Sequence, residues 1–148
     1  MKTTNRRDQD NSINIALLLY DHMLATSVSL PVEMLRAGEA VALQENRQAP
    51  RLSIQMVAEN IKPISTRALI KLLPDTDIDH AQRPDFAFIP SLWRNPRPTI
   101  ARQPKMLQWL SDIWQQGSTL IGGGTGVCLM AEAGILDHHP ATTHWHYV

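Results

Sequence analysis

The sequence contains a single cysteine, Cys128, among its 148 residues. One thiol cannot form a disulfide within the chain, which agrees with a reducing compartment. No apolar run approaches the roughly 20 residues that span a bilayer, and the polar first eleven residues lack the apolar centre of a signal peptide. We therefore expect a cytoplasmic protein that does not enter a membrane.

The sequence also lacks an excess of charge of either sign. Lysine and arginine together number 14, as do aspartate and glutamate, so the formal net charge is zero. A balanced chain has no basic surface of the kind that binds nucleic acid, and helix-turn-helix, heptad and zinc-finger patterns are missing too. We expect any contact with DNA to need a C-terminal domain that this chain does not contain.

The composition predicts one folded domain over residues 12–148, preceded by a disordered polar arm over residues 1–11. Apolar runs predict strands at 13–20, 52–58, 85–90 and 118–121, with a small hairpin within 61–73. Residues 75–84 are polar, and 91–103 indicate an irregular loop. Helices are expected from Thr26 or Ser27 to about 43, from 104 to 116 and from 125 to 133.

Details of these segments sharpen the helix predictions. In the first helix, Leu30, Met34, Ala37 and Val41 recur on one face, with Leu35 and Ala42 beside them, and predict its apolar side. Pro31 is expected in the first turn of this helix. In the second helix, Pro104 opens the first turn, and Gly117 is typical of a residue that follows a helix end. The apolar stripe of that helix comprises Met106, Leu107, Leu110, Ile113 and Trp114.

The alternation of strands and helices predicts an α/β fold: a flavodoxin-like, doubly wound, mostly parallel sheet with helices on both faces. Such sheets bind ligands beyond the carboxyl ends of their strands. Here those ends fall at residues 21–26, 90–92 and 122–126. Of the four tryptophans, Trp93 follows one of these ends and is the best candidate to line a pocket.

The glycine-rich turn from Gly122 to Gly126 connects a strand to a helix. It lacks the Lys-Ser/Thr pair of a phosphate-binding P-loop, and Val127 stands where a dinucleotide-binding turn needs glycine. Two interpretations remain open: a purely structural tight turn, or a turn whose backbone contacts an anion or another ligand.

The segment Thr125–Asp137, followed by Ala141–Trp145, resembles the N-terminal domain of AraC/XylS-type transcription regulators. That domain belongs to the ThiJ/PfpI, or class I glutamine amidotransferase-like, superfamily. Residues 30–38 are similar to the first helix of the family, and residues 85–90 to the strand that leads to its site. The resemblance covers roughly residues 12–148, although the domain of the family continues with further strands and a helix, so the sheet is expected to be incomplete at its C-terminus.

The resemblance implies that the catalytic parts are mostly missing. Enzymes of the superfamily carry a cysteine nucleophile at the turn, where this chain has Gly124, and an acidic residue where it has Ser27. Ser91 and Leu92 replace the glycines that lend an oxyanion-hole amide, and only His144 is retained. Because glycine has no thiolate, no covalent intermediate can form at this turn, and we expect the chain not to be an enzyme.

The resemblance implies a non-catalytic domain that senses a small molecule, without a cofactor or a metal, and it allows a homodimer. The backbone amides of Thr125 and Gly126 can still hold a carboxylate or a phosphate. The candidate ligand-binding residues are Asp21, Ser27, Ser91, Leu92, Trp93, Gly124, Thr125, Gly126 and His144. Two alternatives remain open: a hydrolase or amidase-like enzyme of the same superfamily, and an inactive truncated fragment.

Neither the lone cysteine nor the cluster of histidines near the C-terminus is expected to form a reactive or metal-binding site. Cys128 lies one helical turn beyond Gly124 and is expected to be a small core residue rather than a displaced nucleophile. Four histidines, His138, His139, His144 and His146, lie in the last eleven residues. No thiol or carboxylate is spaced to complete a metal site with them, and the adjacent pair indicates a polar turn.

Overall fold

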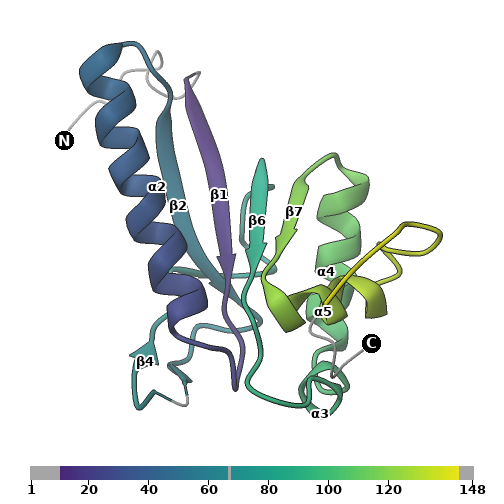
Figure 1. Cartoon of the computed structure of the whole chain (residues 1–148). Coiled ribbons are helices and arrows are strands. Elements are labelled where there is room, and N and C mark those ends of the chain that lie inside the picture. Colours follow the sequence, from purple (N-terminus) through teal and green to yellow (C-terminus); the bar gives the residue numbers. More distant parts are fainter. Residues whose placement is uncertain (1–10, 67, 144–148) are drawn as a thin grey trace.

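A five-stranded parallel sheet forms the centre of the molecule, in the computed structural model that describes residues 11–66 and 68–143. Its order is β5-β2-β1-β6-β7. The strands are β1 (Ser12–Leu18), β2 (Arg51–Ala58), β5 (Thr76–Asp77), β6 (Phe86–Ile89) and β7 (Thr119–Gly122). Strands β1, β2, β6 and β7 run downward in Figure 1, so their carboxyl ends lie at the bottom. The predicted fold class is confirmed.

The helices are α2 (Thr26–Glu45), α3 (Arg97–Ile100), α4 (Pro104–Gln115) and α5 (Val127–Glu132), with a short 3-10 helix, η1, at Gly124–Gly126. The chain moves outward from β1 in one direction to β2 and in the other to β6 and β7. Right-handed crossovers in opposite directions place α2 and α4 on opposite faces of the sheet. In Figure 1, α2 accordingly runs beside β2 and β1, whereas α4 and α5 lie beside β7.

The two faces of the sheet are named here by these helices. Strand register puts Phe88 beside Leu17 and Ile121 on the α2 face, and Ala87 beside Ala16 and Leu120 on the α4 face. The main core lies on the α4 face, where Ala87 and Ile89 are fully buried together with the side chains of α4.

The prediction for α4 is confirmed for most of its residues. Pro104 occupies the first turn, Met106, Leu110 and Ile113 are buried, and Leu107 is half-buried. Trp114, predicted in the same apolar stripe, is instead 42% exposed, because it lies at the edge of the stripe in the last turn of the helix. Gly117 has a φ of 93°, and the amide of Ser118 donates to the carbonyl of Ile113 at 2.9 Å. This is the Schellman arrangement, in which a glycine in the left-handed region ends the helix and satisfies its last carbonyl groups.

The face of α2 that was predicted to be its apolar, packed side does not pack on the sheet, so this prediction is wrong. The sheet-facing side chains are Val28, Val32, Leu35, Glu39 and Leu43, which are buried or half-buried. Leu30, Met34 and Val41 are instead 57%, 66% and 54% exposed. The helix also begins early enough that Pro31 lies inside it rather than in its first turn. Apolar residues occur on more than one side of α2, so their spacing alone could not identify the packed side.

Some smaller elements were predicted and others were missed. The predicted hairpin is present as β3 (Ile64–Ser65) paired with β4 (Lys71–Leu72). The polar segment 75–84 contains the edge strand β5, and the predicted loop 91–103 contains α3. Within the described residues, no helix combines the length and the apolar character needed to cross a membrane. Residues 1–10 of the expected arm lie outside the described part of the chain.

Candidate functional site at the carboxyl ends of the strands

Backbone hydrogen bonds join the loop after β1 to the loop after β6. The amide of Leu24 donates to the carbonyl of Ser91 at 2.8 Å, and the amide of Trp93 donates to the carbonyl of His22 at 2.9 Å. Between these bonds, Met23 and Leu92 form an isolated antiparallel bridge. The two loops therefore form one small structural unit, as expected for neighbouring strand ends of a parallel sheet.

The glycine turn after β7 joins the same unit through close backbone contacts. The amide of Gly123 donates to the carbonyl of Ile89 at 2.9 Å, and a Cβ at Gly126 would collide with that carbonyl. Gly124 has a φ of 49°, in the left-handed region that side chains disfavour. A strained turn from strand to helix is the backbone arrangement of a nucleophile elbow. The turn therefore retains the backbone shape of the elbow.

The space that a side chain at Gly124 would occupy is already filled. A Cβ built there would collide with the Ser91 hydroxyl, which donates to the carbonyl of Gly123 at 2.9 Å. Ser91 is one of the positions where the resemblance places a glycine in enzymes of the superfamily. In this chain the polar side chain therefore belongs to Ser91, in the loop after β6, and the turn itself carries glycine.

Thr125 fastens the glycine turn to the loop after β6. Its hydroxyl accepts from the amide of Leu92 at 2.8 Å and donates to the carbonyl of the same residue at 3.0 Å. Thr125 and Leu92 are only 6% and 4% exposed. Both side chains are thus committed to packing, and any contact that these two residues make with a ligand would have to use the backbone.

Tyr20 anchors the loop after β6 through a buried hydrogen bond, a role that the sequence patterns did not predict. Its side chain is fully buried at the end of β1, and its hydroxyl donates to the carbonyl of Pro90 in a short hydrogen bond. Burial and the proximity of the Cys128 thiol raise the pKa of this phenol far above its usual range. A tyrosine at the end of an apolar strand was the available signal, because a buried hydroxyl needs a partner.

The remaining candidate residues differ in their exposure. Asp21 is exposed, Ser27 is half-buried at the start of α2, and Trp93 is 46% exposed beside Ser91. His144 lies outside the described residues. The described chain ends close to the turn, because the Thr143 hydroxyl donates to the carbonyl of Gly124 at 3.1 Å. The polar side chains that contact the glycine turn directly are thus those of Ser91 and Thr143.

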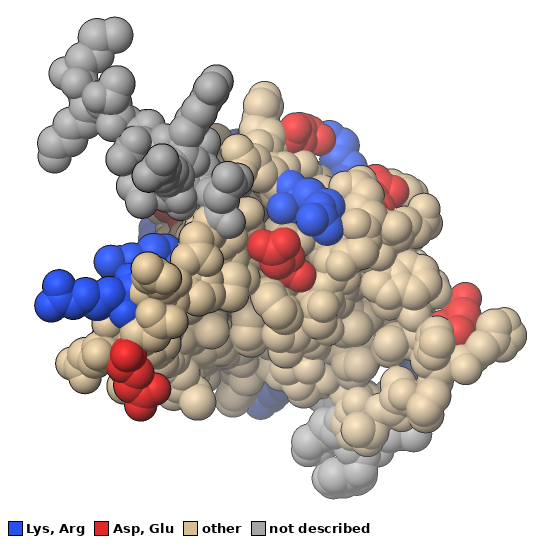
Figure 2. All heavy atoms as spheres, turned by 90° about the horizontal axis from the view of Figure 1, so that it is seen from above, with Lys and Arg blue, Asp and Glu red and all other residues tan. Residues whose placement is uncertain are grey.

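Neither cysteine chemistry nor a metal site is indicated by the described residues. Cys128 is half-buried and packs against the core. No group of three histidine, cysteine or carboxylate residues within 11–66 and 68–143 lies close enough together to hold a metal ion. At the end of the molecule opposite the site, seen from above in Figure 2, lysine and arginine are interspersed with aspartate and glutamate.

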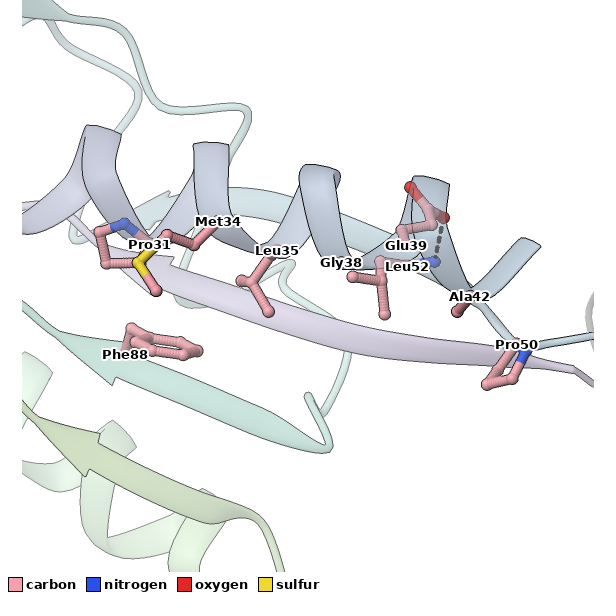
Figure 3. A pocket seen from close by; sticks show the side chains of 9 residues that line it. All are labelled: Pro31, Met34, Leu35, Gly38, Glu39, Ala42, Pro50, Leu52 and Phe88. Atoms are coloured by element: carbon pink, nitrogen blue, oxygen red, sulfur yellow. Dashed lines mark hydrogen bonds between the residues drawn. The ribbon is translucent and has the colours of Figure 1, made fainter. Parts of the chain in front are cut away.

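The apolar groove in Figure 3 lies away from this site. It has a volume of about 540 Å³ and runs between α2 and the α2 face of the sheet. Met34 and Leu35 line it from the helix, and Leu52 and Phe88 from the strands. The only carboxylate in its lining is that of Glu39, which accepts a hydrogen bond from the amide of Leu52 at 2.7 Å. That bond and the neighbouring Arg36 hold the pKa of Glu39 below its usual range.

Comparisons with known proteins identify the same fold in solved structures. A protein from Vibrio parahaemolyticus assigned as a transcriptional regulator has a TM-score of 0.77 at 20% identity, over 91% of this chain and 68% of that one. A ThiJ/PfpI family protein from Pseudomonas syringae has a TM-score of 0.75 at 19% identity, over 98% and 57%. An AraC family transcriptional regulator from Pseudomonas putida has a TM-score of 0.68 at 18% identity, over 90% and 65%.

Sequence comparison gives a shorter match. A stretch of 48 residues is 46% identical to the HTH-type transcriptional regulator CdhR of Pseudomonas aeruginosa. The stretch covers 32% of this chain and 14% of CdhR, so the chain spans a small part of that relative. No family model matches the chain. Taken with the sheet order and the elbow backbone, these matches confirm the resemblance drawn from the sequence: the chain has the fold of the ThiJ/PfpI proteins, and AraC-family regulators are among its structural neighbours.

Proposed function

We propose that the chain is the non-catalytic, ligand-sensing part of an AraC-type transcription regulator. In this proposal residues 12–148 receive a small effector in the cytoplasm, and a C-terminal domain beyond this chain binds DNA. The regulator neighbours and the local identity to CdhR support the regulatory half. The observation that carries the non-catalytic half is that Gly124, at the tip of the turn, supplies no nucleophilic atom. The Ser91 hydroxyl occupies the position next to it that a Cβ would take.

The contacts around the turn support binding in place of catalysis. The Ser91 hydroxyl donates its proton to the carbonyl of Gly123, which is not a base that would activate it for attack. Asp21, Ser27 and the exposed side of Trp93 border the same loops, with His144 as a further candidate. A small carboxylate is a suitable ligand class, because a helix-start amide and these polar side chains can donate to its oxygens. Of the two amides predicted to hold it, that of Gly126 already donates to the carbonyl of Gly123 at 2.7 Å, so in this proposal the amide of Thr125 takes that role.

A thermal-shift series with acetate, lactate, glycine and glutamate as probes tests this site. We expect at least one probe to raise the melting temperature of the 148-residue chain, because a ligand that binds only the folded state stabilises it. Trp93→Ala should remove that rise. Trp114→Ala is the matched control, because Trp114 is 42% exposed on α4, away from the three loops. No rise with any probe, or equal loss in both variants, would contradict the proposal.

Two further measurements separate the alternatives. A hydrolase or amidase should cleave p-nitrophenyl acetate or glutamine, and its Cys128 should react with a thiol probe faster in the folded chain than in a short peptide. We expect neither result. For the regulatory half, the reading frame that continues past Val148 in the gene should encode a pair of helix-turn-helix motifs, and its absence would remove that half alone.

A further inference from the structure

The connection from β5 to β6 leaves part of the α4 face without a helix. The chain crosses there from the edge strand β5 to β6, which lies on the far side of β1. Parallel sheets usually make such a crossing with a helix, but residues 78–85 cross as turns and extended chain. A hollow of about 350 Å³, named here the polar hollow, lies between this segment and the sheet. The polar side chains that line it are those of Asn14, Ser53, Gln55, Thr76, His80 and Gln82.

The two faces of β2 differ in polarity at this place. The side chains at 52, 54 and 56 on the α2 face are all apolar, whereas Ser53 and Gln55 project from the α4 face into the polar hollow. One step further along the same face, Val57 is fully buried. Inner strands of a parallel sheet are normally apolar on both faces. The polar side chains of β2 are therefore confined to the floor of the polar hollow.

Most polar side chains of the hollow have no partner in the chain. Within the described residues, no hydrogen bond is formed by the side chains of Asn14, Ser53, Gln55 and Gln82. The backbone of Asn14 is nevertheless fixed, because its amide donates to the Asp85 carboxylate and its carbonyl accepts from the Asp85 amide, both at 2.8 Å. The polar hollow therefore offers three amides and a hydroxyl whose donors and acceptors are available to a ligand.

His80 adds an oriented ring at the border of the polar hollow. Its Nδ1 lies 2.6 Å from the Asp77 carboxylate, and its backbone amide donates to the same carboxylate oxygen at 3.0 Å. Because a carboxylate only accepts, Nδ1 carries the proton, and Nε2 of the neutral ring is an acceptor. The ring is thus held in place by a residue outside the hollow, and one of its nitrogen atoms is left for a ligand.

We propose that the polar hollow binds a small neutral polyol. No lysine, arginine or carboxylate side chain is among the described residues that line it, so a charged ligand would lose water without gaining a counter-charge. An apolar ligand would leave the amides unpaired. Hydroxyl groups both donate and accept, as the amides do, and the volume lies near the lower end of the roughly 300–1,000 Å³ of small-molecule pockets. No residue of the glycine turn lines the hollow, so this site is independent of the proposed function.

Nuclear magnetic resonance on the ¹⁵N-labelled 148-residue chain tests the site, with glycerol, ribose and myo-inositol as probes of increasing size. We expect at least one probe to shift the side-chain amide resonances of Asn14, Gln55 and Gln82 saturably, with a dissociation constant of about 10 mM or below. Acetate and ethylammonium should not shift them, because the hollow offers no opposite charge. The melting temperature is unsuitable here, because polyols at high concentration stabilise any folded protein through their exclusion from its surface.

Variants of matched size test the role of the amides. Gln55→Leu and Gln82→Leu should each weaken binding of that polyol about fivefold, because leucine has a similar volume but forms no hydrogen bonds. Gln44→Leu is the control, at an exposed position of α2 on the opposite face of the sheet, and should leave the affinity unchanged. The same spectra show whether each variant folds. No saturable shift up to about 50 mM of any probe, equal shifts of exposed amides over the whole surface, or equal weakening by all three variants would each overturn the proposal.

Discussion

Two parts of the sheet lie outside the cover of the described helices, and their side chains differ sharply. On the α4 face, over β5, β2 and β1, the sheet presents Asn14, Ser53, Gln55 and Thr76. These side chains line the polar hollow, together with His80 and Gln82 of the segment between β5 and β6. On the α2 face, over β6 and β7, the sheet presents Phe86, Phe88 and Ile121, called here the bare patch, with the exposed Thr119 beside Phe86.

The difference lies in how the two regions interact with water. Amide and hydroxyl side chains over β2 and β1 form hydrogen bonds with water, so that part of the sheet needs no protein cover. Aromatic and branched side chains over β6 and β7 stabilise a structure only when water is removed from them. The polar region is therefore suited to solvent, whereas the bare patch is suited to cover by apolar side chains. Substitutions in the two regions should accordingly differ in their effects on folding and on association.

A substitution under a helix should cost far more than one in the bare patch. Leu110→Ala, at a fully buried position of α4, should lower the free energy of unfolding by about 3 kcal/mol, because it leaves a cavity in the core. Phe86→Ala should cost less than half of that in dilute, monomeric protein. Urea denaturation of both variants measures the difference. Equal losses would mean that the bare patch is already part of a core.

A charge in the bare patch should affect association more than folding. Ile121→Lys should lower the light scattering of concentrated solutions, because a lysine divides the exposed apolar surface of the bare patch. The same change in the polar hollow, Gln55→Lys, should leave the scattering unchanged. A similar response from both variants would contradict the contrast between the two regions.

An apolar side chain in the polar hollow should have little effect on folding but should make the protein associate. Ser53→Val places a small apolar side chain at an exposed position on β2, so the free energy of unfolding should change by no more than about 0.5 kcal/mol. Light scattering at increasing concentration should detect new self-association, because the change extends the exposed apolar surface. Ser53→Thr is the control that retains the hydroxyl.

The smallest effect concerns the ion pair at the edge of the polar hollow. His80 and Asp77 are 2.6 Å apart, and their hydrogen bond raises the pKa of His80 above 6.5 and lowers that of Asp77 below 3.8. The pair stabilises the fold at pH values between the lowered pKa of Asp77 and the raised pKa of His80. The contribution of His80 is lost as pH rises through its raised pKa, and that of Asp77 as pH falls through its lowered pKa. His80→Ala should slightly reduce the pH dependence of the melting temperature across this window. A difference in melting temperature between the variant and the unaltered chain that occurs only at pH 8 or above would contradict the assignment.

The order of the main elements could be predicted from the sequence because buried parallel strands appear as continuous apolar runs. Residues 13–20 and 85–90 illustrate this signal. The side of α2 that packs on the sheet could not be predicted, because Leu30, Met34 and Val41 form as regular a stripe as Val28, Val32 and Leu35. The edge strand β5 was missed because two paired residues within a polar segment leave no periodicity.

The site shows a similar division. The glycine turn and its place beyond the strand ends could be predicted, because a run of glycines between an apolar strand and a helix is typical of a tight strand-to-helix turn. The collision between Gly124 and Ser91, and the contact between Tyr20 and Pro90, join residues more than thirty positions apart. Such pairs depend on how the strand ends meet in space, which local sequence patterns do not specify.

The double hydrogen bond between Thr125 and Leu92 has a mechanical consequence. It holds the glycine turn to the loop after β6, which in turn is bonded to the loop after β1 through Ser91 and Trp93. The three loops consequently resist independent movement. A molecule that displaces any one of them would shift the start of α2 as well, because Leu24 immediately precedes the first turn of that helix. A ligand bound near the turn would therefore change the position of α2, a helix of 20 residues.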